Sequence, residues 1–440
     1  DNVAVGVSCL SANITGTDNV AIGTAALKNN TNSFNTAVGD RCMETNTSGT
    51  NNTALGHQAL FNNTTGGLNT ALGLNSLYNN TTASNNVAVG HSALFTASTG
   101  HSNTAMGKEA GYDLTTGTGN AFYGIKAGEN TTTGVANTFI GGSYASYVGS
   151  ANSTGSYNVA LGADALAANT TANSNTAIGS FALKANTTGG TNVAIGNDCM
   201  DSNTTGGSNT AVGVDSLQAN TTGDFNVSIG YEAAYLNTTG ASVTAVGKSA
   251  LIAHTTGSNT TAVGKGAGNQ NTTGAQNTFV GRDSGKNVTT GNNNTVLGDN
   301  TSASSATVSN EFTLGNSSVT NLRCNDTSIS SLSDARDKTN VQDIPLGLDF
   351  VNQMRPVSFD WDRRDGSYKG KKDFGFIAQE LKEIQDNTAY ADHMRLVRDD
   401  NPEKLEADPM KTYPVLVKAI QELSAKVEEL QTEIKTLKGN

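Results

Sequence analysis

A repeat of 17 residues runs through the first 315 residues of this chain and limits the folds it can adopt. The repeat usually ends in an Asn-x-Ala-Val/Ile-Gly block, whose glycine recurs at positions 6, 23, 39, 56, 73, 90, 107, 124, 141, 162, 179, 196, 213, 230, 247, 264, 281, 298 and 315. Two intervals differ, with 16 residues between Gly23 and Gly39 and 21 between Gly141 and Gly162. A period this short has room for one or two strands and their turns, so each repeat is predicted to be one rung of a stacked rod.

Two apolar patches mark each rung. One lies in the two residues before the repeat glycine, and the other lies three and four residues after it, as at Ala59-Leu60 and Ala182-Leu183. This pattern predicts two short strands per rung that face a narrow interior. Asn-Thr-Thr-Gly runs, such as the one from Asn63 to Gly66, are predicted corners because Asn and Gly accept left-handed backbone.

The apolar content of the chain favours assembly of several copies. Hydrophobic residues make up 36% of the chain and aromatic residues 6%, so a single thin roll would expose a continuous strip of Val, Ile and Leu. Three copies around a common axis would bury these strips in one shared core. We therefore predict a mainly β, trimeric parallel β-roll or solenoid, with a shaft roughly 90 Å long at ~4.8 Å per rung.

The repeat block resembles the head of trimeric autotransporter adhesins of the YadA type. The resemblance rests on blocks such as Asn19 to Gly23 and Asn192 to Gly196 and covers residues 1–315. It implies a surface-exposed binding rod and identifies no ligand.

The composition changes sharply near residue 316. Residues 1–315 contain 9 Lys or Arg and 16 Asp or Glu, whereas the remaining 125 residues contain 18 and 22. The five prolines and Trp361 also lie in this C-terminal part. A different kind of domain is therefore expected there, preceded by a polar neck at residues 316–332.

Residues 333–410 are predicted to form a small α/β domain. Their apolar spacing predicts a helix within residues 346–354, strands at 356–361 and 373–377, and a helix that begins at Ala378.

Residues 411–440 carry a heptad pattern typical of a coiled-coil helix, with its seam at Leu416, Ile420, Leu423, Val427, Leu430, Ile434 and Leu437. The β-branched residues at one core position and leucine at the other favour two strands when taken alone. We give the trimer precedence because the much longer shaft should dictate the oligomer.

Two further motifs resemble the self-cleaving intramolecular chaperone of phage tailspikes and tail fibres, of which the endosialidase tailspikes are the best-known members. The motifs are Ser333-Asp334-x-Arg336-x-Lys338-x-Asn340-Val341 and Gly375-Phe376-Ile377-Ala378-Gln379-Glu380-Leu381. The resemblance covers residues 333–440. It implies a domain that trimerises, helps the upstream fibre to fold in register and then cuts itself off, with Ser333 as nucleophile, Lys338 as its partner and Leu332–Ser333 as the scissile bond.

This role is consistent with the chemistry of the two residue types. A serine hydroxyl is a poor nucleophile at neutral pH, and a neutral lysine beside it can act as its base. Desolvation or nearby positive charge favours the neutral amine, and Arg336 is the nearest positive residue in the sequence. The expected enzyme is thus a serine endopeptidase that acts once on its own chain, and no activity on an external substrate is evident.

The 21-residue interval contains three tyrosines that are candidate receptor contacts, Tyr144, Tyr147 and Tyr157. Exposed tyrosines suit sugar binding, although the insertion is also consistent with a corner that is simply looped out. Cys9, Cys42 and Cys199 stand where Ala is usual and are predicted to be small core residues. No metal site is expected because the five histidines share no ligand spacing, and no cofactor is expected.

The net charge of −11 argues against nucleic acid as a partner, and no apolar run suggests insertion into a membrane. The chain enters directly on a repeat at Asp1, which predicts a missing N-terminal part that joins other virion tail proteins. The leading hypothesis is a homotrimeric phage tail fibre or spike, assembled in the host cytoplasm, that binds a host surface glycan or receptor. A cellular trimeric adhesin and a polysaccharide-degrading tailspike are the alternatives.

Overall fold

The chain divides into two compact units, the shaft at Asp1–Gly315 and a C-terminal unit at Asn316–Asn440. The computed structural model describes residues 1–440 except 143–144, 320, 324–332, 365–368, 400–404 and 440.

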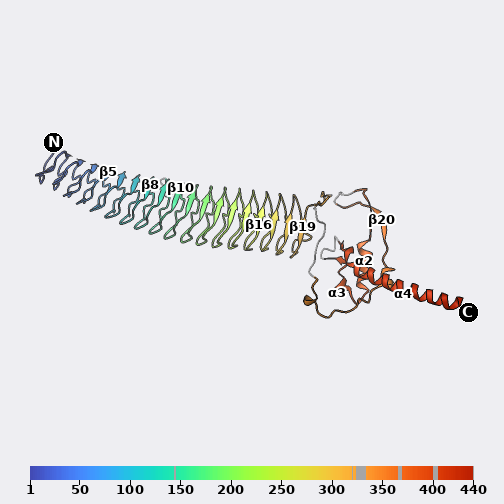
Figure 1. Ribbon diagram of the computed structural model, residues 1–440. Coiled ribbons are helices and arrows are strands. Elements are labelled where there is room, and N and C mark those ends of the chain that lie inside the picture. Colours follow the sequence, from blue (N-terminus) through green and yellow to red (C-terminus); the bar gives the residue numbers. More distant parts are fainter. Residues whose placement is uncertain (143–144, 320, 324–332, 365–368, 400–404, 440) are drawn as a thin grey trace. The chain divides into compact units, whose positions relative to one another are not determined.

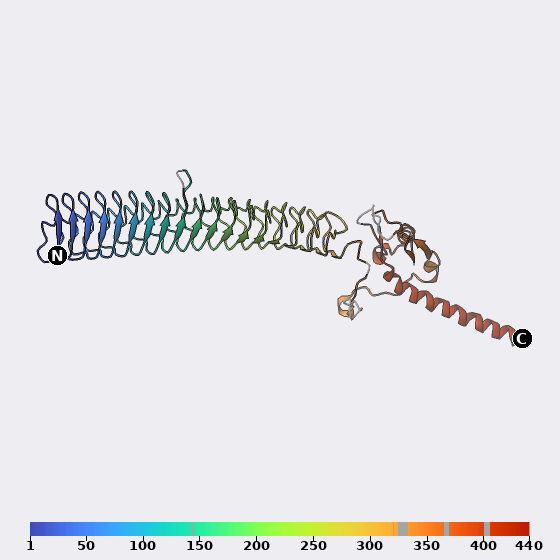
Figure 2. The same cartoon turned by 90° about the horizontal axis from the view of Figure 1, so that it is seen from above.

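The shaft is a parallel β-solenoid in which each rung contributes one strand of three residues. Each strand pairs in parallel with the next one along the chain, so that Thr53 is level with Thr70 and Leu55 with Leu72. Figure 2 shows the strand arrows in a single row along the shaft (see also Figure 1). The described strands are β1 (Val3–Val5), β2 (Val20–Ile22), β3 (Thr36–Val38), β4 (Thr53–Leu55), β5 (Thr70–Leu72), β6 (Val87–Val89), β7 (Thr104–Met106), β8 (Ala121–Tyr123), β9 (Thr138–Ile140), β10 (Val159–Leu161), β11 (Thr176–Ile178), β12 (Val193–Ile195), β13 (Thr210–Val212), β14 (Val227–Ile229), β15 (Thr244–Val246), β16 (Thr261–Val263), β17 (Thr278–Val280), β18 (Thr295–Leu297) and β19 (Phe312–Leu314). The predicted solenoid of stacked repeats is confirmed.

The second strand predicted for each rung is wrong, because the second apolar patch forms a corner. Leu60, in this patch, has a left-handed backbone with φ of 53°, which interrupts an extended chain. Its side chain is nevertheless fully buried, and its N–H donates to the carbonyl of Ser76 in the next rung at 2.9 Å. The tight turn brings the chain back within 17 residues, while the leucine still fills the interior.

The shaft interior is narrow and is filled by few side chain types. The middle residue of each strand is usually a buried alanine, and the corner leucine lies beside it. At Phe279 the large ring replaces alanine, and Gly268 and Gly285 stand where leucine is usual, since a Cβ at either glycine would overlap the ring. The exchange keeps the filled volume of the rung nearly constant, as close packing requires. Buried Cys42 and Cys199 confirm the prediction of small core residues, and their burial raises the pKa of each thiol to about 12.

Aromatic side chains form a column on four successive rungs. The rings of Phe61, Tyr78, Phe95 and Tyr112 are stacked nearly parallel, with centroids 5.2, 5.2 and 5.0 Å apart. Each ring covers the faces of its neighbours, so the column favours the stacked register of these rungs.

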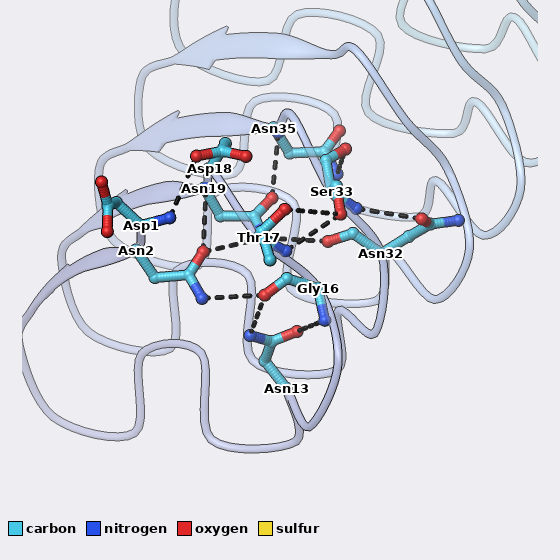
Figure 3. A network of polar contacts seen from close by, with 10 residues as sticks. All are labelled: Asp1, Asn2, Asn13, Gly16, Thr17, Asp18, Asn19, Asn32, Ser33 and Asn35. Atoms are coloured by element: carbon cyan, nitrogen blue, oxygen red, sulfur yellow. Dashed lines mark hydrogen bonds and ion pairs between the residues drawn. The ribbon is translucent and has the colours of Figure 1, made fainter.

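Buried asparagines connect the rungs through two ladders of hydrogen bonds. In the first, the Oδ1 atom of each asparagine accepts the backbone N–H of the equivalent residue on the next rung. Figure 3 shows this for Asn2 with Asn19 at 2.9 Å and for Asn19 with Asn35 at 3.0 Å. The asparagines predicted as tolerant corner residues therefore also satisfy backbone groups that the interior removes from water.

The second ladder joins asparagine side chains directly, and His254 interrupts it. Asn63 Nδ2 donates to Asn46 Oδ1 at 2.7 Å, and most other rungs repeat this contact. His254 replaces an asparagine in this ladder and is fully buried, with Nδ1 2.7 Å from Asn271 Oδ1 and Nε2 2.6 Å from Gly257 O. A neutral imidazole has only one N–H to donate to these two oxygens. Asn237 Oδ1 and Asn271 Nδ2 have no partner among the described residues.

We expect His254→Asn to stabilise the shaft because it would supply both missing partners. A buried polar group without a partner costs about 1–3 kcal/mol. Burial also lowers the pKa of His254 from 6.5, so the stability it contributes is complete above that value and is lost as the pH falls toward the lower pKa of the folded state. Thermal unfolding at pH 7.5 and 5.5 should show a higher melting temperature and a smaller pH dependence for the variant. His91→Asn, at an exposed site, is the matched control, and equal curves for the two variants would contradict this account.

The C-terminal unit is a small α/β domain that ends in a long helix. Its elements are the 3₁₀ turn η1 (Ala335–Asp337), α1 (Leu348–Val351), β20 (Val357–Asp360), β21 (Lys372–Gly375), α2 (Ala378–Asp386), α3 (Ala391–Met394), β22 (Val397–Arg398), β23 (Glu406–Ala407), η2 (Pro409–Thr412) and α4 (Tyr413–Lys438). The two predicted strands pair as an antiparallel hairpin, β20 with β21. The predicted strands and helices are confirmed.

The long helix α4 is connected to the rest of its unit only near its N-terminal end. Val415 belongs to the core cluster with Phe350 and Leu381, and Glu422 Oε2 accepts the N–H of Leu348 at 2.7 Å, at the start of α1. Beyond that point the heptad side chains are exposed in the single chain, which leaves the seam free to contact other copies.

Candidate functional site

The candidate site is a tight turn at residues 333–338. Asp334 has an extended backbone, and its Oδ1 atom accepts the N–H of Arg336 at 2.9 Å. The N–H of Lys338 then donates to Ala335 O at 3.2 Å and closes the turn. Aspartate is a favoured residue at the start of such a turn because its carboxylate satisfies a free backbone N–H. The local sequence therefore explains why the chain folds back here.

The turn brings Ser333 and Lys338 into direct contact. Lys338 Nζ lies 2.6 Å from Ser333 Oγ and 3.2 Å from Ser333 O. Both residues are exposed. A nucleophile and a base must lie within hydrogen-bond distance of each other, and these two predicted site residues do.

Arg336, expected to be the positive neighbour of the lysine, turns toward Asp334 instead. Its Nη2 atom lies 2.6 Å from Asp334 Oδ2. Hydrogen bonding in this pair raises the pKa of Arg336 and lowers the pKa of Asp334. Sequence reasoning did not assign a role to Asp334, although its place just before a short turn is a recognisable capping signal.

The other predicted site residues are less fully described. Leu332 and Tyr144 lie outside the described residues. The Tyr147 ring lies 5.3 Å from Lys126 Nζ, and its N–H donates to Asp164 Oδ1 at 3.0 Å. Tyr157 is exposed at the corner that precedes β10, whereas Lys126 and Asp164 follow their strands. Tyr147 and Tyr157 therefore lie on opposite sides of the strand column.

Across the part of the chain that the structure describes, no three His, Cys, Asp or Glu side chains are grouped so as to hold a metal ion. Among the same residues, no helix combines the length and apolarity needed to span a bilayer.

Comparison with known proteins identifies the C-terminal unit. Residues 333–392 match the family described as the chaperone of endosialidase, and the match begins at Ser333 of the candidate site. No curated protein matches the chain. A parallel β-solenoid followed by this segment is the architecture of a phage tail fibre or tailspike with an endosialidase-type chaperone.

Proposed function

We propose that this protein is a trimeric phage tail fibre or spike for attachment to the host surface, matured by cleavage of its own chain. The C-terminal unit templates the trimer and then separates from the shaft at the Leu332–Ser333 bond. The observation that carries the proposal is the 2.6 Å contact between Lys338 Nζ and Ser333 Oγ, at the first residue of the segment that matches the chaperone family. That family match implies a self-assembling homotrimer.

The proposed reaction has two steps. In the first, Ser333 Oγ attacks the carbonyl carbon of Leu332 while the neutral Lys338 amine takes the hydroxyl proton. The Leu332–Ser333 amide bond then breaks, the Ser333 nitrogen receives that proton, and Leu332 becomes an ester of the Ser333 side chain. In the second step, water hydrolyses the ester and leaves a Leu332 carboxylate and a free Ser333 hydroxyl. Because the groups are held together in one turn, the first step needs no encounter between molecules.

The strand face of the shaft supports self-association of the shaft. We use this name for the outward side of β1–β19, formed by the first and third residue of each strand. The third residues are apolar on every rung, from Val5 to Leu314, and all of them are partly or largely exposed in the single chain. Monomeric proteins rarely expose a continuous apolar surface of this length, so we infer that copies of the chain cover it.

Helix α4 supports the same arrangement at the other end of the chain. Its heptad seam is exposed from Ile420 to Leu437, and packing of these seams would hold the C-termini of the copies level. Alignment matters because rungs that are nearly identical can pair one or more rungs out of register at little cost. A chaperone that starts assembly from one end solves this problem.

The direct test is the mass of the purified full chain and the N-terminal sequence of any small fragment. We expect a large and a small fragment, with the small one beginning at Ser333. A fragment that begins elsewhere, or a chain that stays intact in assembled trimers, would refute the proposed cleavage. Light scattering on the same sample tests the trimer.

We expect Asp334→Ala to slow cleavage about fivefold to tenfold, the effect of losing a capping contact that holds the turn. Asp334→Asn should retain most of the rate, because asparagine also caps such turns. The rate of fragment appearance, followed at several pH values, should fall for the alanine variant without a shift of its pH midpoint. An asparagine variant as slow as the alanine variant would show that the carboxylate acts by its charge.

A further inference from the structure

Four large side chains project from one corner of the shaft with nothing in their own chain to cover them. Phe34, Leu68, Tyr157 and Phe225, here called the corner knobs, are 57% to 66% exposed. Each stands directly before a buried asparagine of the first ladder. On most other rungs this position holds a small or polar residue, such as Asn51 or Ser102.

The backbone at this corner makes large residues unfavourable there. The four knobs have φ between 59° and 64°, a region that Asn and Gly accept more readily than bulky residues. The corner leucine at position 60 also has a positive φ, but its side chain is fully buried, which compensates for the strain. The knobs receive no such compensation within the chain, so we look for it in a contact with another molecule.

The knobs border the strand face. Alternate residues of an extended segment point to opposite sides, and the asparagine that follows each knob is buried. The knob column, the first strand residues and the third strand residues are therefore three neighbouring outward rows. A copy that packs on the strand face must also meet the knobs, which makes a second copy of this chain the partner that fits.

The spacing of the knobs distinguishes one register from all others. They precede β3, β5, β10 and β14, so their six pairwise separations are 2, 4, 5, 7, 9 and 11 rungs and are all different. When a copy slides by any whole number of rungs, at most one knob comes level with another knob position. A regularly spaced set would not have this property.

The opposite edge of the strand face carries matching apolar residues at two of these rungs. The residue after the repeat glycine is Leu74 on the rung of Leu68, and Tyr231 on the rung of Phe225. Both are exposed, at 42% and 46%. A slip of one rung would place Leu68 opposite His91 and Phe225 opposite Lys248 instead.

We propose that the corner knobs dock on the opposite edge of the neighbouring copy and lock the three shafts in register. This inference rests on the proposed trimer. It assigns to the shaft its own record of alignment, independent of the C-terminal unit, which would hold the rungs level after the chaperone has been cut away.

The test uses full-length chains that carry Leu55→Cys, on the strand face of β4, and in which the four native cysteines are changed to Ala or Ser. Copies in register bring the three introduced thiols level, whereas a slip of one rung adds about 4.8 Å along the shaft and takes them beyond disulfide reach. The knob variant carries Asn at all four knob positions. The matched control changes Asn51, Asn85, Asn259 and Asn293, in the same column, to Ser.

We expect the disulfide-linked yield of the knob variant to fall about tenfold or more relative to the control, since each buried large side chain favours its docked state by at least that factor. Leu74→Asn with Tyr231→Asn should have a similar effect, and adding it to the knob variant should change little. Equal yields in the knob variant and the control would overturn the inference and leave the trimer standing. An unaltered chain that is monomeric by light scattering would instead refute the proposed trimer.

Discussion

The Ser333→Ala variant should assemble into a normal trimer and never divide at the Leu332–Ser333 bond. The serine hydroxyl is exposed and contacts Lys338, so its removal takes away the nucleophile without disturbing the core. Lys338→Ala should still cleave, but at least ~10²-fold more slowly, which is the usual cost of losing a general base. Gel electrophoresis under denaturing conditions, with light scattering for the assembled state, measures both effects.

Thr339→Ala is the matched control for these variants, since it removes an exposed hydroxyl that the proposed mechanism does not use. The cleavage rate should not depend on protein concentration once trimers exist, because nucleophile, base and scissile bond belong to one segment. Undiminished cleavage in Ser333→Ala would remove Ser333 from the mechanism. A rate that rises with trimer concentration would show that the cut occurs between assemblies.

Deletion of residues 333–440 should yield a shaft that is misassembled or insoluble. The nineteen similar strands offer many wrong registers, and long-range parallel pairing is slow and exposes sheet edges while it proceeds. Without a template at one end, mispaired copies should accumulate. Sedimentation of the lysate and light scattering of the soluble fraction provide the measurement.

The uncleavable Ser333→Ala chain is the control for this deletion because it keeps the chaperone attached. It should give a soluble trimer. Recovery of an equally soluble, homogeneous trimer from residues 1–332 alone would refute the template role while leaving the cleavage chemistry intact. Once formed and cut, the shaft should be stable for a kinetic reason, since the template needed to refold it has gone.

Local pattern was sufficient to predict much of this protein. The spacing of the repeat glycines predicted the stacked rungs, because parallel pairing in register requires equivalent residues at equal intervals. The heptad leucines from Leu416 to Leu437 predicted the long helix α4 for a similar reason, since helical periodicity is a property of the segment itself. The two sequence motifs were sufficient to identify the chaperone-type segment at residues 333–392.

Other features depend on contacts that a pattern does not contain. An apolar pair such as Ala59-Leu60 fits a strand or a buried corner equally well, and closure of the rung decided for the corner. The capping bond of Asp334 and the contact of Lys338 with Ser333 arise only when the turn closes. The exposure of Phe34 and Phe225 likewise follows from the direction of the corner backbone. Periodicity sets which residues share a column, whereas the three-dimensional path of each rung decides which columns are buried and which face another molecule.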